Sequence, residues 1–380
     1  MFRSTLLACA DAGAAVLRQE VGLMYYAGID AHLKYLSIAV VDHTGKVVSE
    51  TRVSTTQTAA LIAALEPYRP LEAVVETCPF WPWIYDVLVP TGIGFHLAHA
   101  KELEAIAHSN RKTDERDALL LARMLSAGLI PEVYARAGPQ RDVVRVLRHR
   151  QHLVRWRTSC VNRIHAQLHA AQLSLPREQL LRRATRGWLD LHAWPKWAPE
   201  QQRCVSMHLH LIDTLTPLIR TTDRHIAELA GMNAAARCLQ TIPGIGPYRG
   251  LLLATELGPI ERFPSARQVA AYAGLAPTVH NSGGKVRHGG IPRGANRYVR
   301  SALVSAVPSH VRAAPESALS EYYQRQKERL GWQVARVATA RKLGHIVFRM
   351  LKTGEAWRAP HTSEYAAQAA ACITEQTQAA

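Results

Sequence analysis

Apolar positions in the first third of the chain form short runs separated by turn residues, a pattern that predicts alternating strands and helices. Strands are expected at residues 26–41, 46–55, 71–76 and 94–98, with a hairpin turn at Asp42-His-Thr-Gly45. Helices are expected at 58–65, 81–89 and 113–126, the last of them amphipathic. This part of the chain therefore predicts an α/β domain.

The rest of the chain has a helical pattern. Residues 139–232 look helical throughout, and one apolar position in every seven predicts a coiled-coil seam of Leu147, Val154, Val161 and Leu168. Further along, Ile242-Pro-Gly-Ile-Gly246 precedes an apolar helix at 251–257, which is typical of the hairpin in a helix-hairpin-helix element. The Ala/Gln/Thr-rich tail at 359–380 is expected to be disordered.

These patterns predict five segments. Residues 1–23 are expected to be a non-essential extension, because Met24 directly precedes the first strand and would serve as the natural start; loss of activity on starting at Met24 would contradict this hypothesis. The following segments are an α/β domain at 24–135, a basic helical or coiled-coil segment at 139–232, a small, mainly helical domain at 237–358, and the tail.

The charge balance narrows the range of partners. The 380 residues carry 46 Lys+Arg against 30 Asp+Glu, a net charge of +16, which favours a polyanion, with nucleic acid ahead of an anionic membrane. No apolar run reaches the ~18 residues of a membrane span, so no membrane association is expected. The six cysteines form no CxxC pair, which fits a reducing cytoplasm and gives no sign of a zinc ribbon or a disulfide framework.

Basic residues gather in the helical segment and in a later glycine-rich loop. The helical segment has seven arginines between 141 and 163 but one acid, Asp142, so contact with a polyanion is favoured over a merely solvated face. Glycines of the predicted hairpin would let backbone amides approach a phosphate, although an ordinary helix–helix turn is the alternative. The expected nucleic-acid contacts are Arg148, Arg155, Gly244, Gly246, Lys285, Arg287, Arg293 and Arg297.

Four carboxylates are candidates for catalysis. Asp30 and Glu76 each stand at the end of a short apolar run, and Asp114 and Asp117 lie three residues apart at the start of a helix, so that they can face one site. Such a cluster would suit two Mg²⁺ ions, with Mn²⁺ as the alternative, and two ions can stabilise both oxygens of a phosphodiester exchange. Each acid taken alone could have a purely structural role. At the start of the helix, for example, Thr113 would serve as the cap, and acids in the first turn would stabilise the helix through its dipole.

Ser282 is the other candidate. From composition alone it is a loop residue, because a serine needs activation before it can attack. No neighbouring acid–histidine pattern supplies that activation.

Taken together, these residues resemble one family. The order of elements is that of a ribonuclease H–like fold, by analogy. Asp30, Glu76 and Lys112-Thr-Asp-Glu-Arg-Asp-Ala118 resemble the DEDD catalytic set of the insertion-sequence 110 family of transposases. Three later motifs look like the second conserved domain of that family: Ile242–Gly246, Ala273-Gly-Leu-Ala-Pro277, and Ser282-Gly283 followed by Gly289-Gly-Ile-Pro-Arg-Gly294. In all, the resemblance covers about residues 25–355.

The resemblance implies a RuvC-type domain, a coiled-coil segment and a small helical transposase domain. It implies a DNA recombinase of an insertion sequence, related to Piv-type DNA invertases, which acts on element ends and target DNA. It further implies guidance by a structured noncoding RNA of the element, a dimer or tetramer, and Ser282 as the nucleophile assisted by the metal-binding acids. In many members a small Thr-Gly-type turn stands where this chain has Thr77-Cys-Pro79.

Two other functions remain open at this point. A structure-specific nuclease of the Holliday-junction type would use the same acids with water as the nucleophile, and Ser282 would be irrelevant. A non-catalytic nucleic-acid-binding protein with a decayed site is disfavoured by the presence of all four acids.

Overall fold

The computed structural model describes residues 24–106, 114–276, 279–282, 285–288 and 295–358. The chain divides into two compact units, Met1–Arg141 and Asp142–Ala380, called here the N-terminal and C-terminal units. The predicted extension at 1–23, the predicted tail at 359–380, the helix cap at Thr113 and the predicted contact Arg293 lie outside the described residues.

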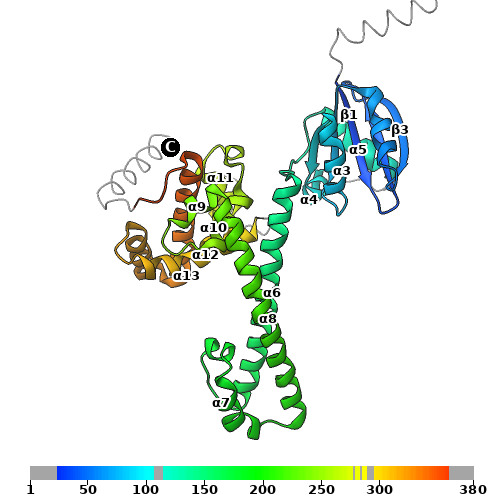
Figure 1. Ribbon diagram of the computed structural model, residues 1–380. Coiled ribbons are helices and arrows are strands. Elements are labelled where there is room, and N and C mark those ends of the chain that lie inside the picture. Colours follow the sequence, from blue (N-terminus) through cyan, green and yellow to red (C-terminus); the bar gives the residue numbers. More distant parts are fainter. Residues whose placement is uncertain (1–23, 107–113, 277–278, 283–284, 289–294, 359–380) are drawn as a thin grey trace, which may run out of the picture. The chain divides into compact units, whose positions relative to one another are not determined.

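The N-terminal unit is a mixed α/β domain built on a five-stranded sheet in the order β3-β2-β1-β4-β5 (Figure 1). Strand β4 runs parallel to both β1 and β5, whereas β2 is antiparallel to both β1 and β3. The strands are β1 (Tyr25–Ala31), β2 (Tyr35–Val41), β3 (Val47–Ser54), β4 (Leu71–Glu76) and β5 (Gly94–Ala98).

Residues 26–41 were expected to form one strand, and that prediction is wrong. The chain turns back after Ala31, and the hairpin closes with the His32 backbone N–H donating to the Tyr35 carbonyl at 3.0 Å. Leu33, at the tip, is 73% exposed. The run of apolar residues on either side hid a turn that has neither glycine nor proline to mark it.

Helices cover both faces of this sheet. Its helices are α2 (Thr58–Leu65), α3 (Trp81–Leu88), α4 (Ala100–Ile106) and α5 (Asp114–Ser126). Apolar residues of α2 and α3 share a core with Ala27, Ile29, Ala73 and Val75. Helix α5 packs through Leu121 and Leu125 against Val74, whose side chain points to the opposite face because side chains alternate along a strand.

The C-terminal unit is almost entirely helical. It begins within α6 (Gly138–Ala170) and continues with α7 (Thr185–His192), α8 (Pro199–Met232), α9 (Ala234–Gln240), α10 (Pro247–Leu257) and α11 (Ala266–Tyr272). A short antiparallel hairpin of β6 (Val279–Ser282) and β7 (Lys285–His288) occupies part of the segment that was expected to be a flexible loop. Helices α12 (Arg297–Ala313) and α13 (Ala318–Thr353) complete the unit.

Helices α6 and α8 lie side by side and antiparallel (Figure 1). Ile164 and Leu168 pack with Val205 and Leu209, and Leu153 packs with Leu215 and Ile219 nearer the other end of the pair. Three positions of the predicted heptad seam, Leu147, Val161 and Leu168, are buried in the C-terminal unit. The seam is therefore covered by other helices of the same chain.

The remaining helices form a second core in the C-terminal unit, to which α9, α10, α12 and α13 contribute. Gly244, in the turn between α9 and α10, has φ +87°, and a Cβ atom there would lie 2.5 Å from the backbone nitrogen of His310. Only glycine allows this approach of the turn to α12. Among the described residues, no helix has both the length and the apolar character to cross a bilayer.

Candidate metal centre and nucleic-acid interface

Two of the predicted acids lie at the same edge of the sheet. Strands β1 and β4 are parallel, with Ile29 opposite Val75, so Asp30 and Glu76 are the next positions along each strand. Since neighbouring residues alternate between faces, both carboxylates lie on the face that α5 covers. The sequence places them there because each follows a run of buried residues that fixes the register.

Helix α5 reaches this edge because β1 has a glycine beneath it. A Cβ atom on Gly28 would lie 2.0 Å from the Ala118 carbonyl oxygen and 2.5 Å from the Ala122 nitrogen. The backbones of β1 and α5 therefore touch, and any side chain at position 28 would push the helix away. Ala118 directly follows Asp117 and lies one turn from Asp114, so this contact sets how near both carboxylates come to Asp30.

Asp30, His32 and Asp114 form the three-ligand group that the described residues offer to a metal ion, with one ligand atom of each within 4.8 Å of the others. His32 Nε2 lies 2.9 Å from Asp30 Oδ2 and 3.4 Å from Asp114 Oδ1. Ionised carboxylates only accept hydrogen bonds, so without a bound cation Nε2 would be the donor to Asp30, whereas a bound cation would require Nε2 to be free of its proton. All three side chains remain partly exposed, which leaves the group open to a substrate.

A further layer of side chains holds Asp114. The Tyr35 hydroxyl donates to Asp114 Oδ2 at 2.7 Å, and the Arg52 guanidinium lies 4.2 Å from the centre of the Tyr35 ring. Arg52 also pairs with Glu115 at 2.9 Å. Glu115 is therefore paired with Arg52 and does not belong to the three-ligand group.

The two aspartates differ in their acidity. Burial raises the pKa of Asp30, and the charges of Asp117 and Asp114 raise it further against the opposing effect of His32. The hydrogen bond from Tyr35 lowers the pKa of Asp114. The charge of Asp117 acts on Asp30, as expected for three acids that face one place, and a cation there would offset their repulsion.

Glu76 is connected to this edge by its neighbours. Burial raises the pKa of the Cys78 thiol, and the nearby charges of Glu76 and Asp30 add to the rise. Thr77 anchors the turn after β4, since its N–H donates to Ala98 at 2.9 Å and its hydroxyl accepts from the Ala100 N–H at 3.2 Å. The Thr77-Cys-Pro turn therefore keeps Glu76 at the edge, although Glu76 does not belong to the three-ligand group.

Sequence reasoning missed His32, Tyr35 and Arg52. His32 follows Asp30 by two positions, and this spacing was a visible signal once the strand is known to end at Ala31. Tyr35 and Arg52 lie on β2 and β3, far from Asp114 in sequence, and no local pattern marks them.

The predicted nucleic-acid contacts in the C-terminal unit fall into different surroundings. Arg148 donates to Glu256 at 3.0 Å and lies over the Tyr298 ring, and Glu256 is only 2% exposed. Gly244 packs against α12. Both residues therefore have a structural role. Arg297 is exposed at the start of α12.

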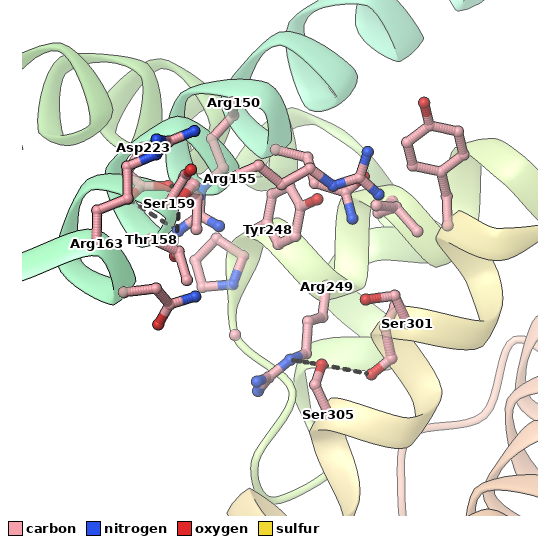
Figure 2. A pocket seen from close by; sticks show the side chains of 18 of the residues that line it. Arg150, Arg155, Thr158, Ser159, Arg163, Asp223, Tyr248, Arg249, Ser301 and Ser305 are labelled. Carbon is pink, nitrogen blue, oxygen red and sulfur yellow. Dashed lines mark hydrogen bonds and ion pairs between the residues drawn. The ribbon is translucent and has the colours of Figure 1, made fainter. Parts of the chain in front are cut away.

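Arg155 and Gly246 line a cavity of about 1030 Å³ within the C-terminal unit (Figure 2). Its walls come from α6, α8, α10 and α12. Four arginines line it against a single carboxylate, that of Asp223; they are Arg150, Arg155, Arg163 and Arg249. Sequence reasoning had singled out Arg150 and Arg163 only as members of an arginine-rich stretch, and had not considered Arg249.

Ser282 ends β6, and Lys285 and Arg287 lie on β7, opposite Ser282 and His280 respectively. The three predicted residues thus belong to one hairpin in the C-terminal unit, whereas the acids belong to the N-terminal unit.

An α/β unit with an acidic sheet edge, followed by a basic helical unit, fits a protein that cleaves or recombines DNA, and comparisons with known proteins identify the family. Residues 27–172 match the DEDD transposase model of the IS110 type, and residues 236–324 match the Transposase IS116/IS110/IS902 family. The chain belongs to the IS110 family of insertion-sequence transposases.

Relatives of similar length carry the same description. The chain is 26% identical to the transposase for insertion sequence element IS1111A of Coxiella burnetii, over 87% of this chain and 90% of that protein. It is 25% identical to the transposase for insertion sequence element IS1328 of Yersinia enterocolitica, over 86% and 96% respectively. A probable family 20 transposase of Pseudomonas aeruginosa is 28% identical over 68% of this chain and 82% of its own length.

Proposed function

We propose that this transposase is an RNA-guided DNA recombinase that depends on Mg²⁺ and uses Ser282 as its nucleophile. The observation that carries the proposal is the convergence of Asp30, His32 and Asp114 at one sheet edge, with the charge of Asp117 also acting on Asp30. Glu76, at the same edge, completes the proposed DEDD set.

The donor set fits a divalent cation. Carboxylate oxygens suit Mg²⁺ or Mn²⁺, and an imidazole is accepted more readily by Mn²⁺. Asp30, Glu76, Asp114 and Asp117 would hold the ion or ions, and His32 would either join them or orient Asp30 and Asp114. When bound, the metal would stabilise charge on the attacking and leaving oxygens.

The fold supports the same proposal. The strand order β3-β2-β1-β4-β5, with its first three strands antiparallel, is consistent with a ribonuclease H–like domain, which we propose for this unit. In the proposed division, residues 24–135 form this domain, 139–232 the helical segment and 237–358 the transposase domain. The α9–turn–α10 segment would be the helix-hairpin-helix element, and the open backbone at Gly246, where a Cβ would meet nothing within 4 Å, would let a phosphate approach.

The proposed chemistry is a transesterification. The Ser282 Oγ would bond to phosphorus while the bond from phosphorus to a deoxyribose oxygen breaks, and the serine proton would end on the released hydroxyl. A carboxylate of the acidic edge would accept that proton in transit, which requires the acids and the serine to meet in the active assembly. Attack by the hydroxyl of another strand would reverse these bonds and complete the exchange.

The partners follow from this chemistry and from the charge. A net charge of +16 suits DNA at the element ends and at the target, together with a structured RNA of the element. Base pairing with that RNA would choose the sites, and phosphate contacts would hold the strands without reading their sequence. A dimer or tetramer is the proposed active form.

A denaturing-gel assay for protein–DNA adducts tests the proposal. It would combine the protein with element-end DNA, Mg²⁺ and the flanking noncoding RNA, and compare wild type with Ser282→Ala and Asp114→Asn. An adduct that requires the RNA and is lost in both variants is expected. Cleavage without an adduct, unaffected by Ser282→Ala but lost in Asp114→Asn, would instead identify a nuclease that uses water.

A further inference from the structure

The arginine-lined cavity in the C-terminal unit has a surplus of positive charge. Arg150 is neutralised by Asp223, with its Nε 2.8 Å from Asp223 Oδ1. Arg155 and Arg163 also line the cavity, and neither forms an ion pair with any residue that the structure describes. Two arginines facing the same hollow repel each other, so an anion between them would be favoured.

Arg249 is built into the wall of this cavity. Its Nε donates to Ser305 Oγ at 3.2 Å (Figure 2). Its Nη1 donates to the Gly244 carbonyl at 2.8 Å. Burial and the charge of Arg150 lower the pKa of Arg249. These bonds fix the guanidinium in place, so that it would lose little freedom when it binds an anion.

The start of α10 adds backbone donors. The cap residue Gly246 has no side chain to accept from the first amides of the helix, and Pro247 follows it. Gly246, Pro247, Tyr248 and Arg249 all line the cavity. The positive end of the helix dipole therefore adds to the charge of the arginines.

The aromatic rings of the cavity are already engaged. The Arg150 guanidinium lies 4.4 Å from the centre of the Tyr248 ring, and that of Arg148 lies 4.6 Å from the centre of the Tyr298 ring. A base would have to displace an arginine in order to stack on that face of either ring. The cavity is thus suited to the charged backbone of a nucleic acid more than to its bases.

The volume of the cavity favours a single strand of nucleic acid over a duplex. Small-molecule sites occupy ~300–1,000 Å³, so a cavity of about 1030 Å³ has room for a nucleotide or two of a single strand. A duplex, whose major groove alone is ~12 Å wide, would rest on the rim. We propose that this cavity clamps the phosphodiester backbone of an unpaired strand, without regard to sequence, through Arg155, Arg163 and Arg249. This inference rests on the proposed action on nucleic acids.

The test measures binding of the full-length protein to three labelled probes: a 20-nucleotide oligo-dT, a 20-nucleotide oligo-U and a 20-base-pair DNA duplex. Each affinity is measured from 50 to 200 mM salt. The cavity variant is Arg155→Gln/Arg163→Gln. The matched control is Arg145→Gln/Arg224→Gln, which removes the same charge from exposed positions outside the cavity.

The salt dependence provides the readout. Each phosphate contact contributes ~0.7 to the slope of log affinity against log salt for a single strand. We expect the cavity variant to lower that slope by about 1.4, so that wild type loses about sevenfold more affinity than the variant across the salt range. The control should change the slope by less than about 0.3, and the duplex slope should change little in either variant.

The results distinguish failure of the proposed strand-binding cavity from failure of the proposed recombinase function. Loss on both oligo-dT and oligo-U supports backbone recognition, and loss on one alone identifies the strand that the cavity holds. Equal slopes in the cavity variant and the control, or equal losses on duplex and single strands, would overturn the clamp while leaving the recombinase proposal intact. Failure of wild type to bind any probe would overturn the proposed function itself.

Discussion

The acidic edge of the N-terminal unit and the arginine-lined cavity of the C-terminal unit are built by opposite means. The edge brings Asp30 and Asp114 together through strand register and one glycine contact, Gly28 with α5. The cavity collects residues from four helices that are distant in sequence. The first arrangement concentrates negative charge where bonds would break, and the second concentrates positive charge where a strand would be held. In the proposed account, bond cleavage and strand binding therefore depend on separate parts of the chain.

The largest effect is expected at the acidic edge. Asp30→Asn or Asp114→Asn should reduce DNA cleavage by at least ~100-fold, more than the ~10–100-fold loss typical of residues that only orient metal ligands. The rate of single-turnover cleavage would show this. Glu115→Gln, on the same turn of α5 but paired with Arg52, is the control and should retain most of the activity. An equal loss in Glu115→Gln would mean that the general charge of the helix, not a metal site, matters.

Gly28→Ala is the next most severe change. The added Cβ would clash with the Ala118 carbonyl, so α5 must move away from β1. We expect a loss of ~2–3 kcal/mol in the free energy of unfolding, in the upper range for overpacking, together with a fall in cleavage. Chemical denaturation measures the first. Gly187→Ala, where a Cβ meets nothing within 4 Å, is the matched control, and a similar loss there would remove the special role of the contact.

Substitutions of Arg148 and Arg155 should affect the stability of the C-terminal unit to different extents. Arg148→Gln removes a partner of the buried Glu256, and we expect a loss of ~1–3 kcal/mol of stability, discounted because Asn296 still donates to Glu256. Arg155→Gln should cost less than ~0.5 kcal/mol. Thermal and chemical unfolding would measure the stability of both variants. Comparable losses of stability in the two would contradict a structural role for Arg148.

Sequence reasoning was effective where periodicity and register act. Asp30 and Glu76 follow buried runs whose alternation fixes their face, so their common edge was predictable from β1 and β4 alone. It failed where distant segments meet. The arginines of α6 looked uncompensated because Asp142 was the only acid nearby in sequence, yet Arg148 and Arg150 find Glu256 on α10 and Asp223 on α8. The φ of Gly244 and its contact with α12 explain why a glycine stands there, and its contact with a phosphate stays a prediction.

The smallest effect concerns pH. His310 is buried, with Nδ1 donating to the Pro243 carbonyl at 2.9 Å and Nε2 lying 2.7 Å from Ser317 Oγ. Burial lowers its pKa below the usual value of ~6.5. As pH falls below ~6.5, the unfolded chain binds a proton that the folded chain does not, so stability decreases on acidification until the lower folded pKa is passed.

Denaturation at pH 7, 6 and 5 would measure this slope, at most ~1.4 kcal/mol per pH unit for one proton. His310→Gln should make the slope shallower. His345, whose pKa burial also lowers, contributes in the same direction and would remain. His225→Gln, at a largely exposed position, is the comparison variant. An unchanged slope in His310→Gln would mean that its buried neutral state does not control the acid sensitivity.

The proposed division between DNA cleavage in the N-terminal unit and strand binding in the C-terminal unit is tested most directly by measuring both activities in two variants. Asp114→Asn should bind single-stranded DNA with the affinity and salt slope of wild type while losing cleavage. Arg155→Gln/Arg163→Gln should bind with a shallower slope but cleave at the wild-type rate when saturated with DNA and RNA. Two results would contradict this division: a loss of binding in Asp114→Asn as large as its loss of cleavage, or a failure of Arg155→Gln/Arg163→Gln to cleave at saturation.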